Sequence, residues 1–236
     1  MAFFDVRSAA STGHVSPVVA VIGEDLGVAL LQHYLRERCG VSSMVVYTNG
    51  VPKTPTNGTG SGSRLDRWLL TQRSETRGRV LYQVEIKNWS ATAIGGREVP
   101  LDAKEEFLRE VRQERWLQQW DSEQECFRYS TVGKVLDRML IPTLMDDELG
   151  KPISIDPPVR QEEVEPMLCF WYVVHDRGEN ESLFSHPLPS AVNGFTQFSV
   201  FSMSNYLRSL KTSEVELEMP SATRRIDWLS RLLKSR

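Results

Sequence analysis

Four charged residues in the first half of the chain have the types and the order that metal-assisted chemistry requires. Glu85 and Lys87 stand two positions apart within the apolar segment 82–91. Side chains at positions i and i+2 of a strand point to the same face. Opposite charges on the inward face of a strand are costly unless they serve a site. Asp66 and Glu24 precede this segment and supply two further carboxylates.

These residue types suit the Mg²⁺-assisted hydrolysis of a phosphodiester. Mg²⁺ prefers oxygen ligands and is usually held by one or two carboxylates, with water and substrate completing its shell. It polarises a phosphoryl oxygen and lowers the pKa of bound water. We expect Asp66, Glu85 and the backbone carbonyl of Ile86 to bind the metal, for which Mn²⁺ can substitute. Lys87 would assist the attacking water or stabilise the transition state, and Glu24 would hold a second metal or a metal-bound water.

Hydrophobic patterns predict the elements that position these residues. Helical spacing begins at residue 17 and ends before Gly40, and residues 44–47 form a short strand. Two strands, 65–71 and 79–89, form a hairpin that carries Asp66 and the Glu85 segment.

The remainder of the chain alternates between further helices and strands. The order of elements indicates a mixed α/β domain, flanked by a flexible arm at 1–16 and an amphipathic, docked C-terminal helix at 213–236. The other expected elements are a Gly-rich loop (57–63), helices at 102–120 and 131–140, a surface excursion (146–166), strands at 167–174 and 195–203, and a helix capped by Ser204 or Asn205.

The order Gly23-Glu24 on a helix, Leu65-Asp66 on a strand and Glu85-Ile86-Lys87 on the next strand resembles the PD-(D/E)XK nuclease superfamily. Leu65 stands where the namesake motif has proline. The resemblance spans residues 17–120, roughly half of the chain. It implies a restriction endonuclease-like core, in which helices flank a mixed central sheet, within a domain of residues 17–212.

The same resemblance implies a Mg²⁺-dependent deoxyribonuclease acting in host defence or DNA processing. It favours an endonuclease, because the Gln-x-x-x-Tyr element of many family exonucleases is absent from the chain. DNA is the expected partner, RNA remains open, and a homodimer is compatible with the family. The alternative is a nuclease-fold scaffold that binds nucleic acid or a protein without cutting, because one fold hosts many functions.

Each residue also has a purely structural interpretation. Glu85 and Lys87 could form an ion pair on a surface-edge strand, and Asp66 could point outward beside two neighbouring arginines. Glu24 could stabilise a helix N-terminus through the macrodipole. A dinucleotide-binding turn after residues 18–22 is disfavoured, because the segment lacks the G-x-G-x-x-G spacing.

Composition sets the remaining limits. The 236 residues are 40% apolar and 25% charged, which suits one globular domain with a sizeable core. The net charge of −3 argues against a wholly basic nucleic-acid coat. Three scattered cysteines argue against a disulfide framework and fit a reducing compartment. No apolar run reaches the roughly 20 residues that span a bilayer, so we expect a cytoplasmic protein that does not enter membranes.

Overall fold

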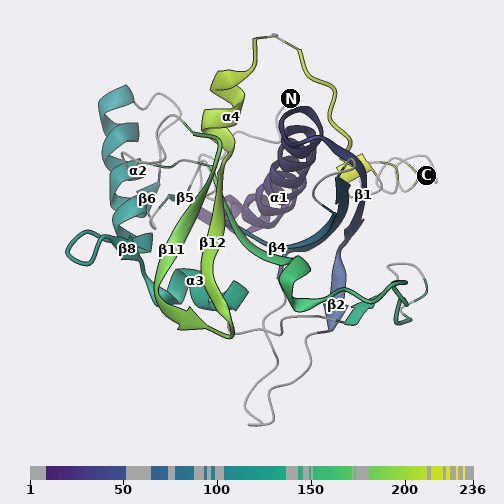
Figure 1. Ribbon diagram of the computed structural model, residues 1–236. Helices are drawn as coiled ribbons and strands as arrows, with labels where there is room; N and C mark the ends of the chain where they lie inside the picture. The colour runs from purple at the N-terminus through teal and green to yellow at the C-terminus, as the bar shows by residue number, and fades with distance from the viewer. Residues whose placement is uncertain are drawn as a thin grey trace.

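A six-stranded mixed sheet runs through the middle of the protein (Figure 1). Its strand order is β1-β3-β4-β10-β12-β11. The pairs β4/β10 and β10/β12 are parallel, and the other neighbouring strands are antiparallel. The mixed α/β class predicted from the sequence is confirmed. The strands are β1 (Val41–Tyr47), β3 (Arg67–Arg73), β4 (Arg79–Lys87), β10 (Val164–Phe170), β11 (Leu183–Val192) and β12 (Phe195–Ser202).

The computed structural model describes a defined part of the chain. The described residues are 9–51, 65–73, 78–87, 93–94, 97–98, 104–136, 143–145, 149, 151–171, 173, 181–211, 214–219, 222–223, 227 and 231. The Gly-rich loop 57–63, residues 1–8 of the expected arm and most of the expected C-terminal helix lie outside these residues.

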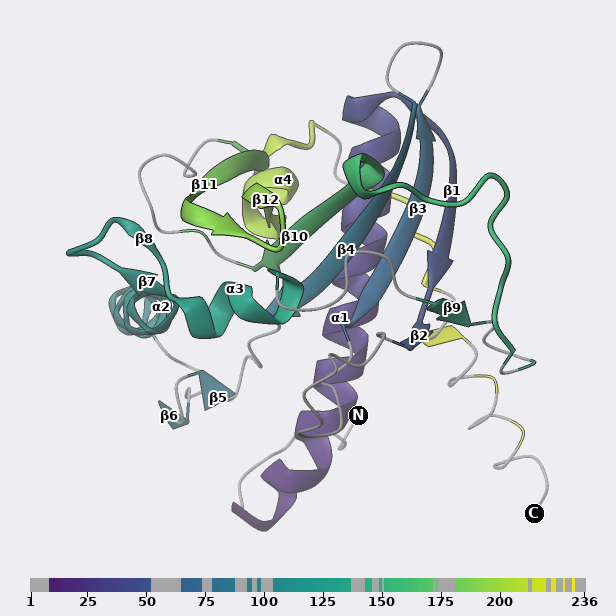
Figure 2. The same ribbon diagram turned by 60° about the horizontal axis from the view of Figure 1, so that its bottom comes forward.

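Helices cover both faces of the sheet, which curves around α1 in Figure 1. Figure 2 shows α1 running along one face, with α2 and α3 on the other side. Among the described residues, no helix combines the length and apolar character needed to cross a bilayer. The helices are α1 (Ala9–Cys39), α2 (Glu105–Gln119), α3 (Tyr129–Leu136), α4 (Met203–Ser209) and the 3-10 turn η2 (Gln161–Glu163).

Among the described residues, three short pairs of strands lie outside the main sheet. Each pair is antiparallel and forms a two-stranded sheet of its own. The pairs are β2 (Asn49–Val51) with β9 (Thr143–Met145), β5 (Ala93–Ile94) with β6 (Arg97–Glu98), and β7 (Trp120–Asp121) with β8 (Cys126–Phe127).

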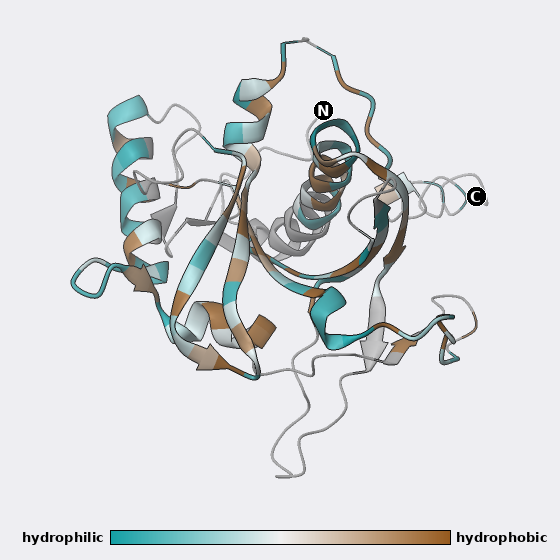
Figure 3. Ribbon diagram, viewed as in Figure 1, coloured by the Kyte–Doolittle hydropathy of each residue, from teal (hydrophilic) through white to brown (hydrophobic). Residues whose placement is uncertain are grey.

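Alternation along β4 assigns its residues to two separate cores. Val84 and Ile86 pack in the core formed with α1 and α4. Leu81 packs in the core formed with α2 and α3. Because successive strand side chains point to opposite faces, Glu85 and Lys87 share the face of Leu81. Figure 3 shows the apolar colouring concentrated where these layers meet, whereas α2 is largely polar.

Several element boundaries differ from the sequence expectation. The first helix begins at Ala9, so residues 9–16 are helical rather than part of an arm, and Pro17 lies inside the helix. A proline removes one helical hydrogen bond, but the turns on either side of it can continue. The helix α4 is capped by the Ser202 hydroxyl, which accepts from the Asn205 amide; Ser204 and Asn205 are therefore not its cap.

Two further differences concern α2 and β11. Residue 102, expected to open α2, lies outside the described residues, and the helix begins at Glu105 without a side-chain cap. The strand β11 was not predicted, because Pro187 and Pro189 interrupt its pattern. Prolines are tolerated at the edge of a sheet, and β11 is an edge strand.

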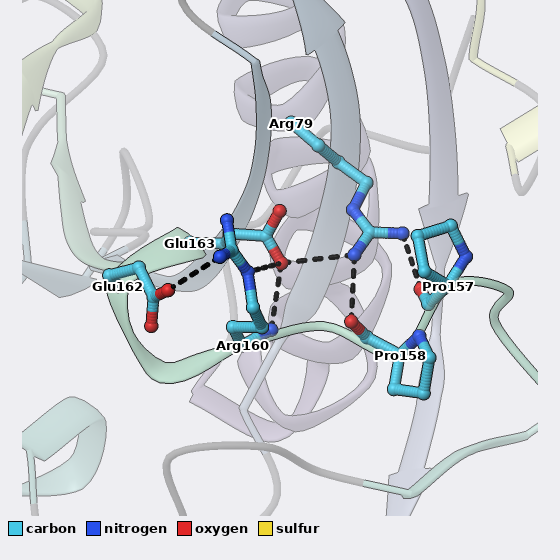
Figure 4. Close-up of polar contacts among 6 residues, drawn as sticks. All are labelled: Arg79, Pro157, Pro158, Arg160, Glu162 and Glu163. Atoms are coloured by element: carbon cyan, nitrogen blue, oxygen red, sulfur yellow. Dashed lines mark hydrogen bonds and ion pairs between the residues drawn. The ribbon is translucent and has the colours of Figure 1, made fainter.

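The start of β4 is tied to the segment before β10 by Arg79 (Figure 4). The guanidinium donates to the backbone carbonyls of Pro157 and Pro158, at 2.5 and 2.9 Å. It also pairs with Glu163 Oε2 at 3.0 Å, and the Arg160 amide donates to the same oxygen at 2.7 Å. These bonds lower the pKa of the Glu163 carboxyl below its ordinary value, and the Arg79 bond contributes most.

Glu163→Gln is expected to destabilise the protein at neutral pH, by about 1 kcal/mol for a charge-assisted contact of this kind. Because the folded-state pKa of Glu163 is lowered, its contribution is present above the ordinary carboxyl pKa and is lost as pH falls through the folded value. Thermal unfolding followed from pH 7 to pH 3 should therefore show the two proteins converging at acid pH. A constant difference across that range would contradict the assignment.

Candidate active site

The β3–β4 hairpin places Asp66 directly beside the Glu85 segment. Asp66 immediately precedes β3, whose first residue, Arg67, pairs with Val84 of β4 in the antiparallel register. Asp66 therefore lies beside the end of β4 that carries Glu85 and Lys87.

A hydrogen bond fixes this arrangement. The backbone amide of Ile86 donates to Asp66 Oδ2 at 2.7 Å. The bond uses one of the two carboxylate oxygens and holds the side chain against the end of β4. Since the N–H and C=O groups of one strand residue point to the same side of the strand, the Ile86 carbonyl also faces the Asp66 side.

Glu85 and Lys87 form an ion pair, with 3.2 Å between Lys87 Nζ and Glu85 Oε1. The Glu85 side chain is only 5% exposed and that of Lys87 is 22% exposed. β4 lies between β3 and β10 in the sheet. The surface-edge interpretation of this pair is therefore wrong, because the pair lies on a central strand and its carboxylate is buried.

Glu24 lies in the middle of α1 rather than at its start, because the helix begins at Ala9. Interaction with a helix N-terminus therefore does not explain it, since that effect is confined to the first turn. Glu24 approaches from the face that α1 covers, with its side chain 31% exposed. It is a neighbour of Asp66 and Glu85, whose charges both raise its pKa.

Gly27, one turn after Glu24, lies where α1 packs against α4 and the end of β4. A Cβ at this position would lie 3.0 Å from Met203 Sδ, which is a tight contact, and 3.5 Å from Ile86 Cγ2, which is an ordinary van der Waals contact. The missing side chain therefore gives room to the Met203 side chain of α4.

Arg67 and Asp25 belong to the same cluster, although they are not among the site residues predicted from the sequence. Arg67 Nη2 lies 2.9 Å from Asp25 Oδ1, and Nη1 lies 4.0 Å from Glu24 Oε2. Nη1 also donates to the backbone carbonyl of Asp66 at 2.6 Å. Strand alternation could have identified Arg67. Successive side chains of a strand point to opposite faces of the sheet, so the residues of β3 alternate between the face covered by α1 and the other face.

Negative charge exceeds positive charge in this cluster. Four carboxylates accompany two cations, which leaves two negative charges uncompensated within the set Glu24, Asp25, Asp66, Glu85, Arg67 and Lys87. Burial raises the pKa of Glu24, repulsion from Asp66 raises it further, Arg67 lowers it, and Asp25 and Glu85 raise it. In addition, the buried Oδ2 atom of Asp25 has no hydrogen-bond partner. Such a site favours the binding of a cation.

The donor set fits Mg²⁺ held by two carboxylates. Asp66 and Glu85 would supply hard oxygen ligands, and Mg²⁺ usually needs no more from the protein than one or two carboxylates. Within the described ranges, no three Asp, Glu, His or Cys side chains are arranged as a group that could hold a metal. The described residues therefore contain no closed multi-ligand cage.

Cys169 lies next to Ile86 in the β4/β10 register and is fully buried. Burial raises the pKa of its thiol, and the charges of Asp66 and Glu85 raise it further. The thiol thus stays protonated at neutral pH, which argues against nucleophilic cysteine chemistry at this site.

A separate cavity of about 520 Å³ lies at the other end of the sheet. Its lining includes Val80 at the start of β4, Glu163 and Glu165 near the start of β10, and Ser199 of β12. The candidate site is at the opposite end of β4, so this cavity does not contribute to it.

In comparisons with protein-family models, curated proteins and solved structures, no match to this chain was found.

Proposed function

We propose that this protein is a Mg²⁺-dependent nuclease of the PD-(D/E)XK type with a restriction endonuclease-like core. One observation carries the proposal: the Ile86 amide holds Asp66 Oδ2 at 2.7 Å, directly beside the Glu85–Lys87 ion pair, in a cluster that has excess negative charge. This is the juxtaposition that the order of motifs in the sequence predicts. It brings metal-binding oxygens and an ammonium group to one end of a central strand.

Asp66, Glu85 and the Ile86 carbonyl would hold the metal, with Mn²⁺ as a substitute. When bound, the metal supplies charge neutralisation and a more acidic bound water. The Ile86 amide restrains Asp66 through Oδ2, so the carboxylate stays beside the Glu85–Ile86 segment. Such preorganisation reduces the reorganisation needed during the reaction.

Lys87 would act on the substrate side of the site. Its ammonium is partly exposed, whereas the partner carboxylate of Glu85 is buried. The cation can therefore face an incoming phosphate or the attacking water and stabilise charge that develops on the phosphoryl group. Glu24, from α1, would support a second metal or a metal-bound water. The proposed substrate is DNA, cut internally, in defence or DNA processing.

Cleavage of supercoiled plasmid by the purified protein tests the proposal. We expect nicked and linear products with Mg²⁺ or Mn²⁺ and none with EDTA. Single-stranded DNA and single-stranded RNA in parallel reactions identify the substrate. Glu163→Gln serves as the matched control for Asp66→Asn, because both substitutions replace a carboxylate by an amide. Glu163 contacts the other end of β4, so its substitution should leave cleavage intact.

The second candidate is a nuclease-fold scaffold that binds nucleic acid or a protein without cutting. The Glu85–Lys87 ion pair favours it, because the pair satisfies Lys87 without any metal. No cleavage of any substrate, together with no Mn²⁺ binding by calorimetry, would support the scaffold. Cleavage that survives Asp66→Asn would instead show that the activity belongs to another site.

A further inference from the structure

Arg67 connects the two parts of the charged cluster. Its side chain is only 13% exposed and leaves the start of β3 toward α1. It contacts Asp25 at 2.9 Å and the backbone carbonyl of Asp66 at 2.6 Å. One guanidinium thus touches both the helix and the residue that carries the proposed metal ligand.

The geometry of a guanidinium makes this connection specific. Arginine presents its donors in a rigid planar fork, whereas the lysine ammonium is a point charge on a flexible stem. Nη2 serves Asp25, while Nη1 serves the Asp66 carbonyl and lies 4.0 Å from Glu24 Oε2. The fork therefore fixes the position of the α1 acids relative to the backbone at Asp66.

We propose that Arg67 is a positioning residue, which sets Glu24 and the main chain of Asp66 in register for metal binding. This inference rests on the proposed nuclease function. It assigns to Arg67 no contact with substrate. The buried ion pair with Asp25 anchors the guanidinium to α1. Because the same guanidinium also bonds the Asp66 carbonyl, it holds α1 against the start of β3.

The chain offers a matched control for this role. Arg79 lies at the other end of the same hairpin, its side chain is also 13% exposed, and it pairs with Glu163 at 3.0 Å. Like Arg67, it donates to backbone carbonyls. Arg67→Met and Arg79→Met thus remove equivalent structural bonds, but only the first lies beside the proposed metal ligands.

The experiment measures kcat and KM for plasmid cleavage and Mn²⁺ affinity by calorimetry, below the unfolding temperature of every variant. Arg67→Met should lower kcat or Mn²⁺ affinity by about 10–100-fold, as for other residues that orient metal ligands, with KM for DNA unchanged. Arg79→Met should retain wild-type kcat and affinity. Arg67→Lys, which keeps the charge but not the fork, should show an intermediate loss and provides the test where the methionine variant does not fold.

Two results would overturn the inference in distinguishable ways. If the wild type cuts DNA while the Arg67 variants match wild type or Arg79→Met in kcat and Mn²⁺ affinity, Arg67 has only a structural role and the nuclease proposal stands. If the wild type neither binds Mn²⁺ nor cuts nucleic acid, both proposals fail together.

Discussion

Asp66→Asn is expected to reduce Mg²⁺-dependent cleavage by about 10³-fold without lowering the stability of the protein. The asparagine side-chain oxygen can still accept the Ile86 amide, which bonds Asp66 Oδ2 in the wild type. The substitution also removes one negative charge from a cluster in which carboxylates outnumber cations. The melting temperature should therefore stay the same or rise while activity is lost, which is the trade-off typical of functional residues.

The change in melting temperature on adding metal tests whether Asp66 binds the metal, independently of any cleavage. A ligand that binds only the folded state at 100 times its Kd stabilises that state by about 2.7 kcal/mol. Titration with Mg²⁺ or Mn²⁺ should therefore raise the melting temperature of the wild type and of Glu163→Gln, but not that of Asp66→Asn. An equal rise in all three proteins would place the metal elsewhere.

Lys87→Met is expected to lower cleavage by about 10²–10³-fold, the size of effect seen when one transition-state donor is removed. Its effect on stability should be opposite to that of Asp66→Asn. Methionine retains the apolar stem but removes the ammonium that pairs with the buried Glu85 carboxylate. We expect a loss of about 1–3 kcal/mol in the free energy of unfolding, because the ion pair is only partly shielded from water.

Two further measurements separate the structural role of Lys87 from its catalytic role. Combining Lys87→Met with Glu85→Gln should recover most of the stability, since the two residues are directly coupled, but none of the activity. Lys87→Met alone should still gain stability from Mg²⁺, because it retains both carboxylates and loses a competing cation. If cleavage were unchanged in a folded Lys87→Met protein, Lys87 would have no part in the reaction.

Local patterns determined much of the fold. Apolar runs bounded by turn residues identified the β3–β4 hairpin and the strands that became β10 and β12. Periodicity of 3.6 residues identified α2 and α3, although their ends differ from the prediction. Residue type alone did not reveal β11 or the cap of α4. The prolines of β11 are tolerated because it is an edge strand, and the cap of α4 is defined by the hydrogen bond from the Asn205 amide to the Ser202 hydroxyl.

Residue order predicted the centre of the candidate site. The i, i+2 spacing put Glu85 and Lys87 on one face, and the predicted hairpin placed Asp66 near them. The structure shows the hairpin and a hydrogen bond from the Ile86 amide to Asp66. Short-range pairing of this kind can be specified by hydrophobic alternation in the sequence.

The tertiary structure decided how buried the Glu85 segment is and what faces it from α1. Two opposite charges on a strand are compatible with a solvated edge, and only the placement of β4 between β3 and β10 shows that the carboxylate is inside. The position of Glu24 and the Arg67–Asp25 pair depend on where α1 crosses the sheet. That crossing depends on packing between residues distant in the chain, such as Gly27 against Met203, which periodicity along one segment cannot encode.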